Sequence, residues 1–277
     1  MSSTTPAASR ISDTLGTIRK EGRTALLPFV TAGYPTMETC EATIHAIVGA
    51  GADGLEIGIP FSDPIADGPT VQRTSQVSLA NGTRLRDCID LVARVRAGGV
   101  TVPIMLMGYF NPVVKYGIDR YVADCTEAGV DGFIIPDLPI EESDWILEPC
   151  RKHGRDLIFM VAPTSTERRM ELVGERGSGF VYCVSVTGVT GARDTVSSGL
   201  AGYLEKLRGY IDLPLIVGFG ISTPNHVREV GKHADGVIVA SAMLNYLDTL
   251  PESEQPQGAA AFVRYLLGQG DLPTTDS

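Results

Sequence analysis

The chain has 277 residues, of which 43% are hydrophobic and 20% charged, as is typical of a folded globular protein. Its formal net charge of -10 argues against a nucleic-acid-binding surface, which requires clustered Lys and Arg. No apolar run approaches the roughly 20 residues of a membrane-spanning helix, and the N-terminal segment lacks an apolar signal core. The sequence therefore predicts a cytoplasmic protein with no membrane or nucleic-acid partner.

Eight short, β-rich apolar runs follow one another along the chain, separated by longer segments of helical periodicity. Several are apolar at nearly every position, as expected of parallel strands covered on both faces. The predicted strands are 25–31, 54–60, 102–109, 132–139, 156–163, 179–186, 213–220 and 235–241. Eight strands alternating with helices predict an α/β fold, a (β/α)8 TIM barrel, with an open doubly wound sheet as the alternative. We expect a single domain over 1–277, with the barrel at about 24–265 and frayed tails.

Amphipathic helices are predicted before and between these strands. An extra N-terminal helix, "RISDTLGTIRKEG", places Ile11, Leu15 and Ile18 on one face. In "STPNHVREVGKH", Thr223 is a suitable N-cap and Pro224 suits the first helical turn. A short repeated Asp-Gly motif precedes the second, fourth and eighth predicted strands, as "GADG", "GVDG" and "HADG". It indicates either a repeated βα unit or the general preference of turns for Asp-Gly.

The residue types near the predicted strand ends limit which catalytic mechanisms are possible. None of the five lysines lies in a predicted strand, so a Schiff-base lysine in the barrel is not expected. The four histidines lie in helical or connecting segments without ligand spacing, so we expect no metal site. The five scattered cysteines show no CxxC and are expected to be buried, reduced thiols. Carboxylates and tyrosines remain as candidates for the chemistry.

Glu56 is the most unusual of these candidates because it interrupts the apolar strand "LEIGI". Strand alternation points it away from Leu55 and Ile57, and therefore into the barrel. Burial raises the pKa of a carboxyl group, which suits a general acid or base near neutral pH. A structural hydrogen bond is the alternative role. Asp67 follows in "IADGP", where turn formation is the alternative, and Asp63 is expected to be a turn or surface carboxylate.

Glycine-rich segments follow the sixth, seventh and eighth predicted strands. They are "VTGVTGAR" (186–193), "GFGIS" (218–222) and "VAS" (239–241). Barrels of this class often bind phosphate at these loops, where glycine lets the backbone approach the ligand. Together with the carboxylates, they indicate an acid–base enzyme that acts on a phosphorylated substrate. Tyr109 and Tyr182 either line this pocket or pack in the core.

Six segments resemble the tryptophan synthase alpha chain family, in the same order. They are "LPFVTAGYP", "LEIGIPFSDPIADGPTVQ", "MGYFNPV", "PDLP", "TGVTGAR" and "VGFGIS", and the resemblance runs from about residue 10 to 265. It implies retro-aldol cleavage of indole-3-glycerol phosphate to indole and glyceraldehyde 3-phosphate. By motif, Glu56 matches the family's catalytic Glu, a general acid–base, and Asp67 its catalytic Asp, which stabilises charge on the indole ring.

The resemblance also implies the substrate-binding residues. It places the phosphate on Gly191, Gly220 and Ser241, with Phe219 beside them. One departure is Ala240, where the family often has glycine.

Around the indole ring, the resemblance implies walls formed by Phe29 and Tyr182, with Tyr109 close by. Thr190 is expected to contact Asp67 when the sixth loop closes. Core packing remains the alternative for Phe29 and Tyr109.

The resemblance further implies a partner, the tryptophan synthase beta chain, in an alpha2beta2 heterotetramer. That chain carries pyridoxal phosphate and receives indole through a tunnel, whereas no cofactor is expected in this chain. The loop 60–67 and the segment around Asp137 are expected to form part of the contact. Two alternatives stay open. One is another phosphate-binding barrel enzyme of the same pathway, such as indole-3-glycerol phosphate synthase, which needs strand lysines. The other is a weakly active subunit that mainly activates a partner.

Overall fold

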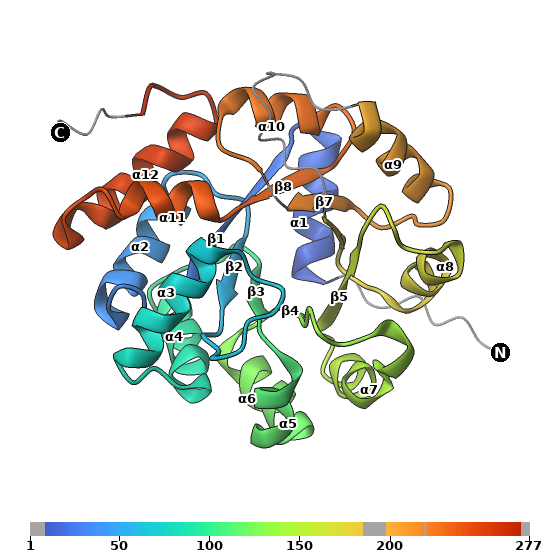
Figure 1. Ribbon diagram of the computed structural model, residues 1–277, viewed down its shortest axis with the longest axis horizontal. Helices are drawn as coiled ribbons and strands as arrows, with labels where there is room; N and C mark the ends of the chain where they lie inside the picture. Colours follow the sequence, from blue (N-terminus) through green and yellow to red (C-terminus); the bar gives the residue numbers. More distant parts are fainter. Residues whose placement is uncertain (1–8, 185–197, 219, 273–277) are drawn as a thin grey trace.

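Eight parallel strands close into a barrel in which each strand pairs with the next one in the chain (Figure 1). The computed structural model describes residues 9–184, 198–218 and 220–272. Pairing of the eighth strand with the first confirms the (β/α)8 barrel and excludes the open sheet. The strands are β1 (Ala25–Thr31), β2 (Leu55–Gly58), β3 (Ile104–Met107), β4 (Gly132–Ile134), β5 (Asp156–Val161), β6 (Val181–Val184), β7 (Leu215–Gly218) and β8 (Gly236–Val239).

Helices surround the barrel. Two helices connect β2 to β3, and two more connect β3 to β4. The α-helices are α1 (Arg10–Lys20), α2 (Met37–Gly49), α3 (Pro69–Ala80), α4 (Leu85–Ala97), α5 (Phe110–Tyr116), α6 (Ile118–Ala128), α7 (Asp144–Lys152), α8 (Glu167–Arg176), α9 (Ser198–Arg208), α10 (Pro224–Gly231), α11 (Ser241–Leu247) and α12 (Gln255–Leu266). Short 3₁₀ turns are η1 (Ile140–Glu142) and η2 (Glu252–Glu254). As predicted, the Thr223 side chain caps α10 and Pro224 occupies its first turn.

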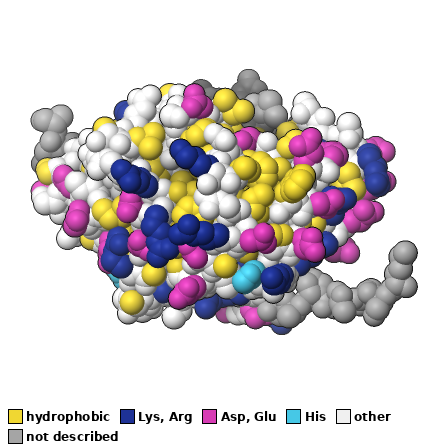
Figure 2. All heavy atoms as spheres, turned by 90° about the horizontal axis from the view of Figure 1, so that it is seen from below, with side chains coloured by type: hydrophobic (Ala, Val, Ile, Leu, Met, Phe, Trp, Pro, Cys, Tyr) yellow, Lys and Arg dark blue, Asp and Glu magenta, His cyan; other side chains and the backbone are white. Residues whose placement is uncertain are grey.

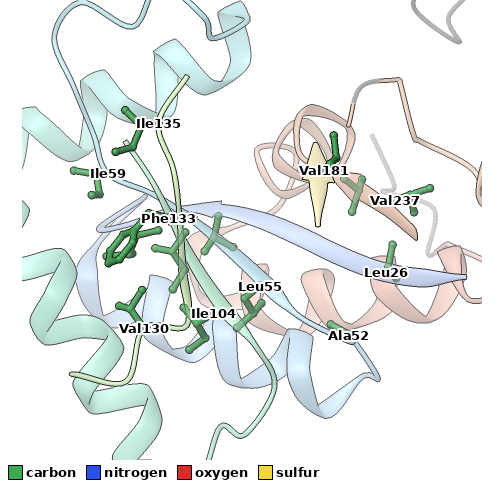
Figure 3. Packing of buried hydrophobic residues seen from close by; sticks show 14 of the residues in the cluster. Leu26, Ala52, Leu55, Ile59, Ile104, Val130, Phe133, Ile135, Val181 and Val237 are labelled. Atoms are coloured by element: carbon green, nitrogen blue, oxygen red, sulfur yellow. The ribbon is translucent and has the colours of Figure 1, made fainter. Parts of the chain in front are cut away.

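Alternating strand positions divide the core into two parts. Leu26, Leu55 and Ile104 belong to the outer part, between the sheet and the helices (Figure 3). Their strand neighbours Leu27 and Met105 belong to the inner part, which fills the barrel. This is the period of two expected of strands that are buried on both faces.

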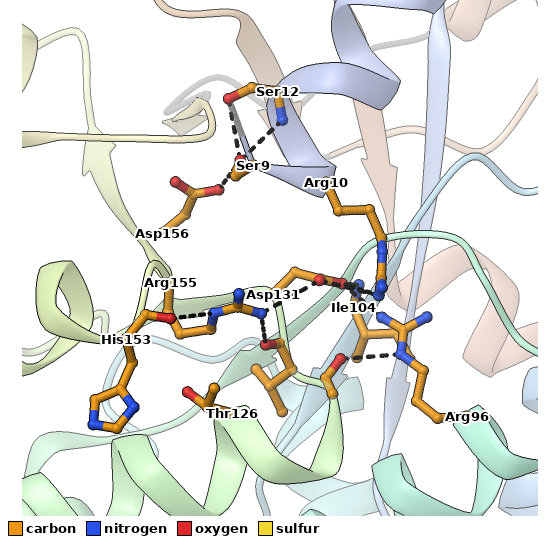
Figure 4. A network of polar contacts seen from close by, with 12 residues as sticks. Ser9, Arg10, Ser12, Arg96, Ile104, Thr126, Asp131, His153, Arg155 and Asp156 are labelled. Atoms are coloured by element: carbon orange, nitrogen blue, oxygen red, sulfur yellow. Dashed lines mark hydrogen bonds and ion pairs between the residues drawn. The ribbon is translucent and has the colours of Figure 1, made fainter. Parts of the chain in front are cut away.

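The extra helix α1 closes the amino-terminal end of the barrel. Ile11, Leu15 and Ile18 are buried in the inner core, as their common face predicts. The side chain of Ser9 caps the helix and also contacts the carboxylate of Asp156, 2.5 Å away (Figure 4). Arg10 pairs with buried Asp131 at 3.1 Å. These contacts hold α1 against the barrel at the end opposite the carboxyl ends of the strands.

The aspartate of the repeated Asp-Gly motif makes the same kind of hydrogen bond at all three places. The aspartate of each motif lies just before a strand and accepts a hydrogen bond from a backbone N–H at the start of the previous strand. These aspartates are Asp53, Asp131 and Asp235. The donors are Leu26, Ile104 and Leu215, at 3.0, 2.8 and 2.7 Å. Each carboxylate also pairs with an arginine, respectively Arg23, Arg96 and Arg208. The repeated Asp therefore satisfies strand-start N–H groups, a role beyond turn formation.

On the face shown in Figure 2, acidic and basic side chains are interspersed, with hydrophobic side chains exposed between them. All five cysteines are buried and free, as expected. Within the part of the chain that the structure describes, no helix has the length and apolar character needed to span a bilayer.

Candidate active site

A cavity of about 610 Å³ lies at the carboxyl ends of the strands. Its lining includes most of the site residues predicted from the sequence. These are Phe29, Glu56, Asp67, Tyr182, Gly220 and Ser241. Thr190, Gly191 and Phe219 lie outside the described residues. Residues as far apart in the sequence as Phe29 and Ser241 therefore meet in one cavity, at the end of the barrel where such enzymes carry their active sites.

Glu56 points into the barrel from β2, as strand alternation predicts. Its paired neighbours are Phe29 on β1 and Met105 on β3, both in the inner core. The side chain is 1% exposed. Both of its carboxyl oxygens lack a hydrogen-bond partner, and they are the only buried side-chain N or O atoms of the described residues in that state. The structural hydrogen bond considered as an alternative is therefore absent from the described residues. An unpaired buried polar group is costly, and groups in that state are concentrated at functional sites.

The two carboxyl groups of the cavity have separated pKa values. Burial raises the pKa of Glu56 to about 8, and the nearby charge of Asp67 acts in the same direction. Burial also raises the pKa of Asp67, to about 6, while a hydrogen bond from Tyr109 opposes the rise. Between these values Glu56 carries a proton and Asp67 is ionised. The site therefore holds one acid and one base near neutral pH.

Tyr109 holds the loop that carries Asp67. Its hydroxyl accepts a hydrogen bond of 2.9 Å from the N–H of Ala66, and its ring stacks on Phe61 with centroids 5.0 Å apart. Burial raises the pKa of Tyr109, so its hydroxyl keeps the proton that it shares with Asp67. One side chain thus contacts both ends of the segment 61–66, a function that the sequence did not reveal.

Two aromatic rings form walls of the cavity, and two glycines make room for them. A Cβ atom on Gly58 would lie 2.5 Å from Cζ of Phe29. A Cβ atom on Gly218 would lie 2.3 Å from the Tyr182 ring. Both distances are far below van der Waals contact, so only glycine lets the rings lie flat against the neighbouring strands.

Gly220 and Ser241 also line the cavity. Gly220 has a φ of 76°, a conformation that favours glycine, and Ser241 is the first residue of α11. Ala240 precedes it with a φ of -123°, outside the left-handed region that favours glycine. The φ at this position therefore does not itself require glycine, which the resembling family often has there.

Several cavity residues were not singled out by the sequence. They are Val71, Met107, Met160, Ile238, Ser222 and Asn245. Met107 and Met160 share the inward parity of Met105 and Ile158, so strand alternation was the signal that could have identified them. Asn245 carries no such signal, because it enters the cavity from α11.

A closed (β/α)8 barrel with an acid–base pair at the carboxyl ends of its strands defines a TIM-barrel enzyme. The family model described as "Tryptophan synthase alpha chain" matches residues 15–266. The tryptophan synthase alpha chain of Roseiflexus sp. (strain RS-1) is 50% identical over 260 residues, covering 94% of this chain and 100% of that protein. The corresponding protein of Roseiflexus castenholzii is 51% identical with the same coverage.

Solved structures agree with these sequence matches. Tryptophan synthase subunit alpha from Legionella pneumophila str. Paris superposes with a TM-score of 0.88 and 35% identity, covering 95% of this chain and 98% of that one. A structure of Mycobacterium tuberculosis tryptophan synthase gives a TM-score of 0.86 at 35% identity, with the same coverage. The chain belongs to the tryptophan synthase alpha chain family, a family of lyases.

Proposed function

We propose that this chain cleaves indole-3-glycerol phosphate to indole and glyceraldehyde 3-phosphate, with Glu56 and Asp67 as the catalytic pair. The observation that carries the assignment is Glu56, a buried carboxyl group without a hydrogen-bond partner inside the cavity. Family membership supplies the reaction, and the separated pKa values supply an acid and a base for it. None of the eight strands among the described residues holds a lysine, so the alternative of a lysine-dependent barrel enzyme has no support.

The first step protonates the indole ring. Glu56 is protonated below its raised pKa of about 8 and can donate that proton to the ring carbon that carries the side chain. The ring then bears a positive charge, centred on its nitrogen. The ionised carboxylate of Asp67 stabilises this charge and accepts a hydrogen bond from the ring N–H.

The second step breaks the carbon–carbon bond. Glu56, now ionised, removes the proton of the hydroxyl group adjacent to that bond. The hydroxyl carbon becomes the aldehyde of glyceraldehyde 3-phosphate, and the electrons of the broken bond return to the indole ring. Glu56 regains its proton in this step, so one carboxyl group moves a proton from the hydroxyl to the ring carbon and ends in its starting state.

The two ends of the cavity suit the two ends of the substrate. Phe29 and Tyr182 form apolar walls near Glu56, which suit the indole ring. Gly220 and Ser241 lie at the end to which we assign the phosphate, with Gly191 and Phe219 as further family-implied contacts. We assign closure over Asp67 to Thr190, again from the resemblance.

Membership of the family implies a beta-chain partner. We infer an alpha2beta2 complex in the cytoplasm, in which the beta chain carries pyridoxal phosphate and this chain carries no cofactor. The loop 60–67 suits the contact because Ile65 is 83% exposed at its tip. The carboxylate of Asp137 accepts a hydrogen bond of 2.9 Å from the N–H of Phe110, and the preceding residue, Tyr109, contacts Ala66 in this loop.

The test is indole release from indole-3-glycerol phosphate by the purified chain, with and without a beta chain. We expect slow turnover that the beta chain accelerates. Glu56→Gln is expected to lower kcat by about 10²–10⁴-fold, and Asp67→Asn by about 10²–10³-fold. Asp63→Asn removes an exposed carboxylate from the same loop and is the matched control for turnover without the beta chain, since the loop 60–67 is assigned to the beta-chain contact. Undiminished turnover in Glu56→Gln would refute the assignment, and inactive wild type would favour a subunit that only activates its partner.

A further inference from the structure

Asp67 lies at the end of a long irregular segment, and its position depends on the helix that follows it as well as on the contacts of Tyr109. Residues 59–68 form no helix or strand between β2 and α3. The side chain of Gln72, in the second turn of α3, donates a hydrogen bond of 2.8 Å to the carbonyl oxygen of Asp67. Any displacement of α3 consequently moves Asp67 within the cavity.

Helix α3 is held against β1 on its inner side. The hydroxyls of Thr74 and Thr31 lie 2.7 Å apart in the core, and the hydroxyl of Ser78 donates to the carbonyl oxygen of Ala32 at 2.6 Å. On its other side α3 lies next to α11 (Figure 1). Gly68 and Val71 from the α3 side and Asn245 from α11 all line the cavity. The α3–α11 contact is therefore one wall of the site.

A polar cluster joins α3 to α11 across this wall. Thr70 donates a hydrogen bond of 3.0 Å to the side-chain oxygen of Asn245. One turn further along, Arg73 forms an ion pair with Asp248, the C-cap of α11. Tyr34, from the turn after β1, donates to the other carboxylate oxygen of Asp248 and accepts from Arg73 at 3.3 Å. Three elements thus meet through these five side chains.

We propose that Tyr34, Thr70, Arg73, Asn245 and Asp248 form a clasp that fixes the separation between the indole end and the phosphate end of the site. Asp67 is coupled to α3, and Ser241 begins α11, so the clasp sets the distance between the two subsites. The members of the clasp other than Asn245 are positioning residues that act through α3 and α11. The inference rests on the proposed function, which supplies a substrate that spans both subsites.

Fold stabilisation alone is a weak explanation for the clasp. Arg73 is 44% exposed and Asp248 23% exposed, and exposed ion pairs contribute only about 0.2–1 kcal/mol to folding. A two-ended ligand, in contrast, gains affinity when its two subsites are held at the correct separation. The clasp is therefore expected to affect a ligand that spans the cavity more than it affects folding.

The experiment compares inhibition constants for three ligands in the cleavage reaction. They are indole, glycerol phosphate, and a non-cleavable analogue in which indole and phosphate are joined by a propyl chain. In Arg73→Gln we expect the joined analogue to bind about tenfold more weakly, while each single-ended ligand binds as in wild type. Asp248→Asn and the double variant are expected to show the same loss, because each substitution removes the same ion pair between Arg73 and Asp248.

Arg94→Gln is the matched control, since Arg94 is 43% exposed and joins two helices by an ion pair with Glu41 away from the cavity. Thermal unfolding of each variant reports its stability, and Thr70→Val tests the clasp with a smaller change if Arg73→Gln folds poorly. An equal loss for all three ligands, or unchanged binding of the joined analogue, overturns the proposal. Failure of wild type to cleave the substrate would instead count against the proposed function.

Discussion

Glu56→Gln is expected to stabilise the folded protein at high pH while removing its activity. The folded protein holds the pKa of Glu56 near 8, against an ordinary value of 4.5. Between these two values the folded state keeps a proton that the unfolded state has lost. Stability that depends on this proton is fully present below the lower value and is lost as pH rises toward the higher value.

The magnitude follows from the size of the shift. A rise in pKa from 4.5 to about 8 corresponds, at about 1.36 kcal/mol per unit, to a loss of about 5 kcal/mol. Water that enters the cavity around the ionised carboxylate reduces this loss. Glutamine has nearly the same shape and no charge at any pH, so the variant avoids the loss altogether.

Urea unfolding of wild type and Glu56→Gln from about pH 5 to about pH 9 measures the effect. The variant's free energy of unfolding should exceed that of wild type by an amount that grows with pH and becomes constant above about pH 8. Asp63→Asn controls for the loss of one negative charge. A difference between wild type and Glu56→Gln that stays constant over this range refutes the argument that burial keeps Glu56 protonated.

Three further substitutions test the roles of the loop that carries Asp67, of the cavity wall and of the barrel core. Tyr109→Phe keeps the ring but loses the hydrogen bond that lowers the pKa of Asp67, so the acidic limb of the pH–rate profile should move to higher pH and kcat should fall about fivefold. Gly58→Ala places a Cβ atom 2.5 Å from the Phe29 ring and should raise KM while costing about 1–3 kcal/mol of stability in urea unfolding. Leu15→Ala, at the closed end of the barrel, should cost about 2–5 kcal/mol and leave KM unchanged. An unmoved pH profile in Tyr109→Phe contradicts the first expectation. An unchanged KM in Gly58→Ala contradicts the second, and a shifted KM in Leu15→Ala contradicts the third.

Local pattern was sufficient for the architecture. Each strand of the barrel falls within an apolar run that the sequence marks, although every strand except β1 is shorter than predicted. Strands 102–109 and 132–139 were expected, whereas β3 covers Ile104–Met107 and β4 covers Gly132–Ile134. The apolar runs continue past the ladder because the chain stays buried as it leaves the sheet. Apolar character reports burial, and it does not report where the ladder hydrogen bonds stop.

The sequence by itself determined that Glu56 faces the barrel interior, because side-chain direction in a strand depends only on parity. It also placed Gly220 and Ser241 in loops after strands, where a cavity forms in this fold. The tertiary structure decided the rest. Tyr109 reaches Ala66 across 43 positions, and Arg73 reaches Asp248 across 175. The pKa of Glu56 likewise depends on burial by the whole barrel and on the charge of Asp67. Such contacts and fields arise only when distant segments pack together, so no local pattern along the chain encodes them.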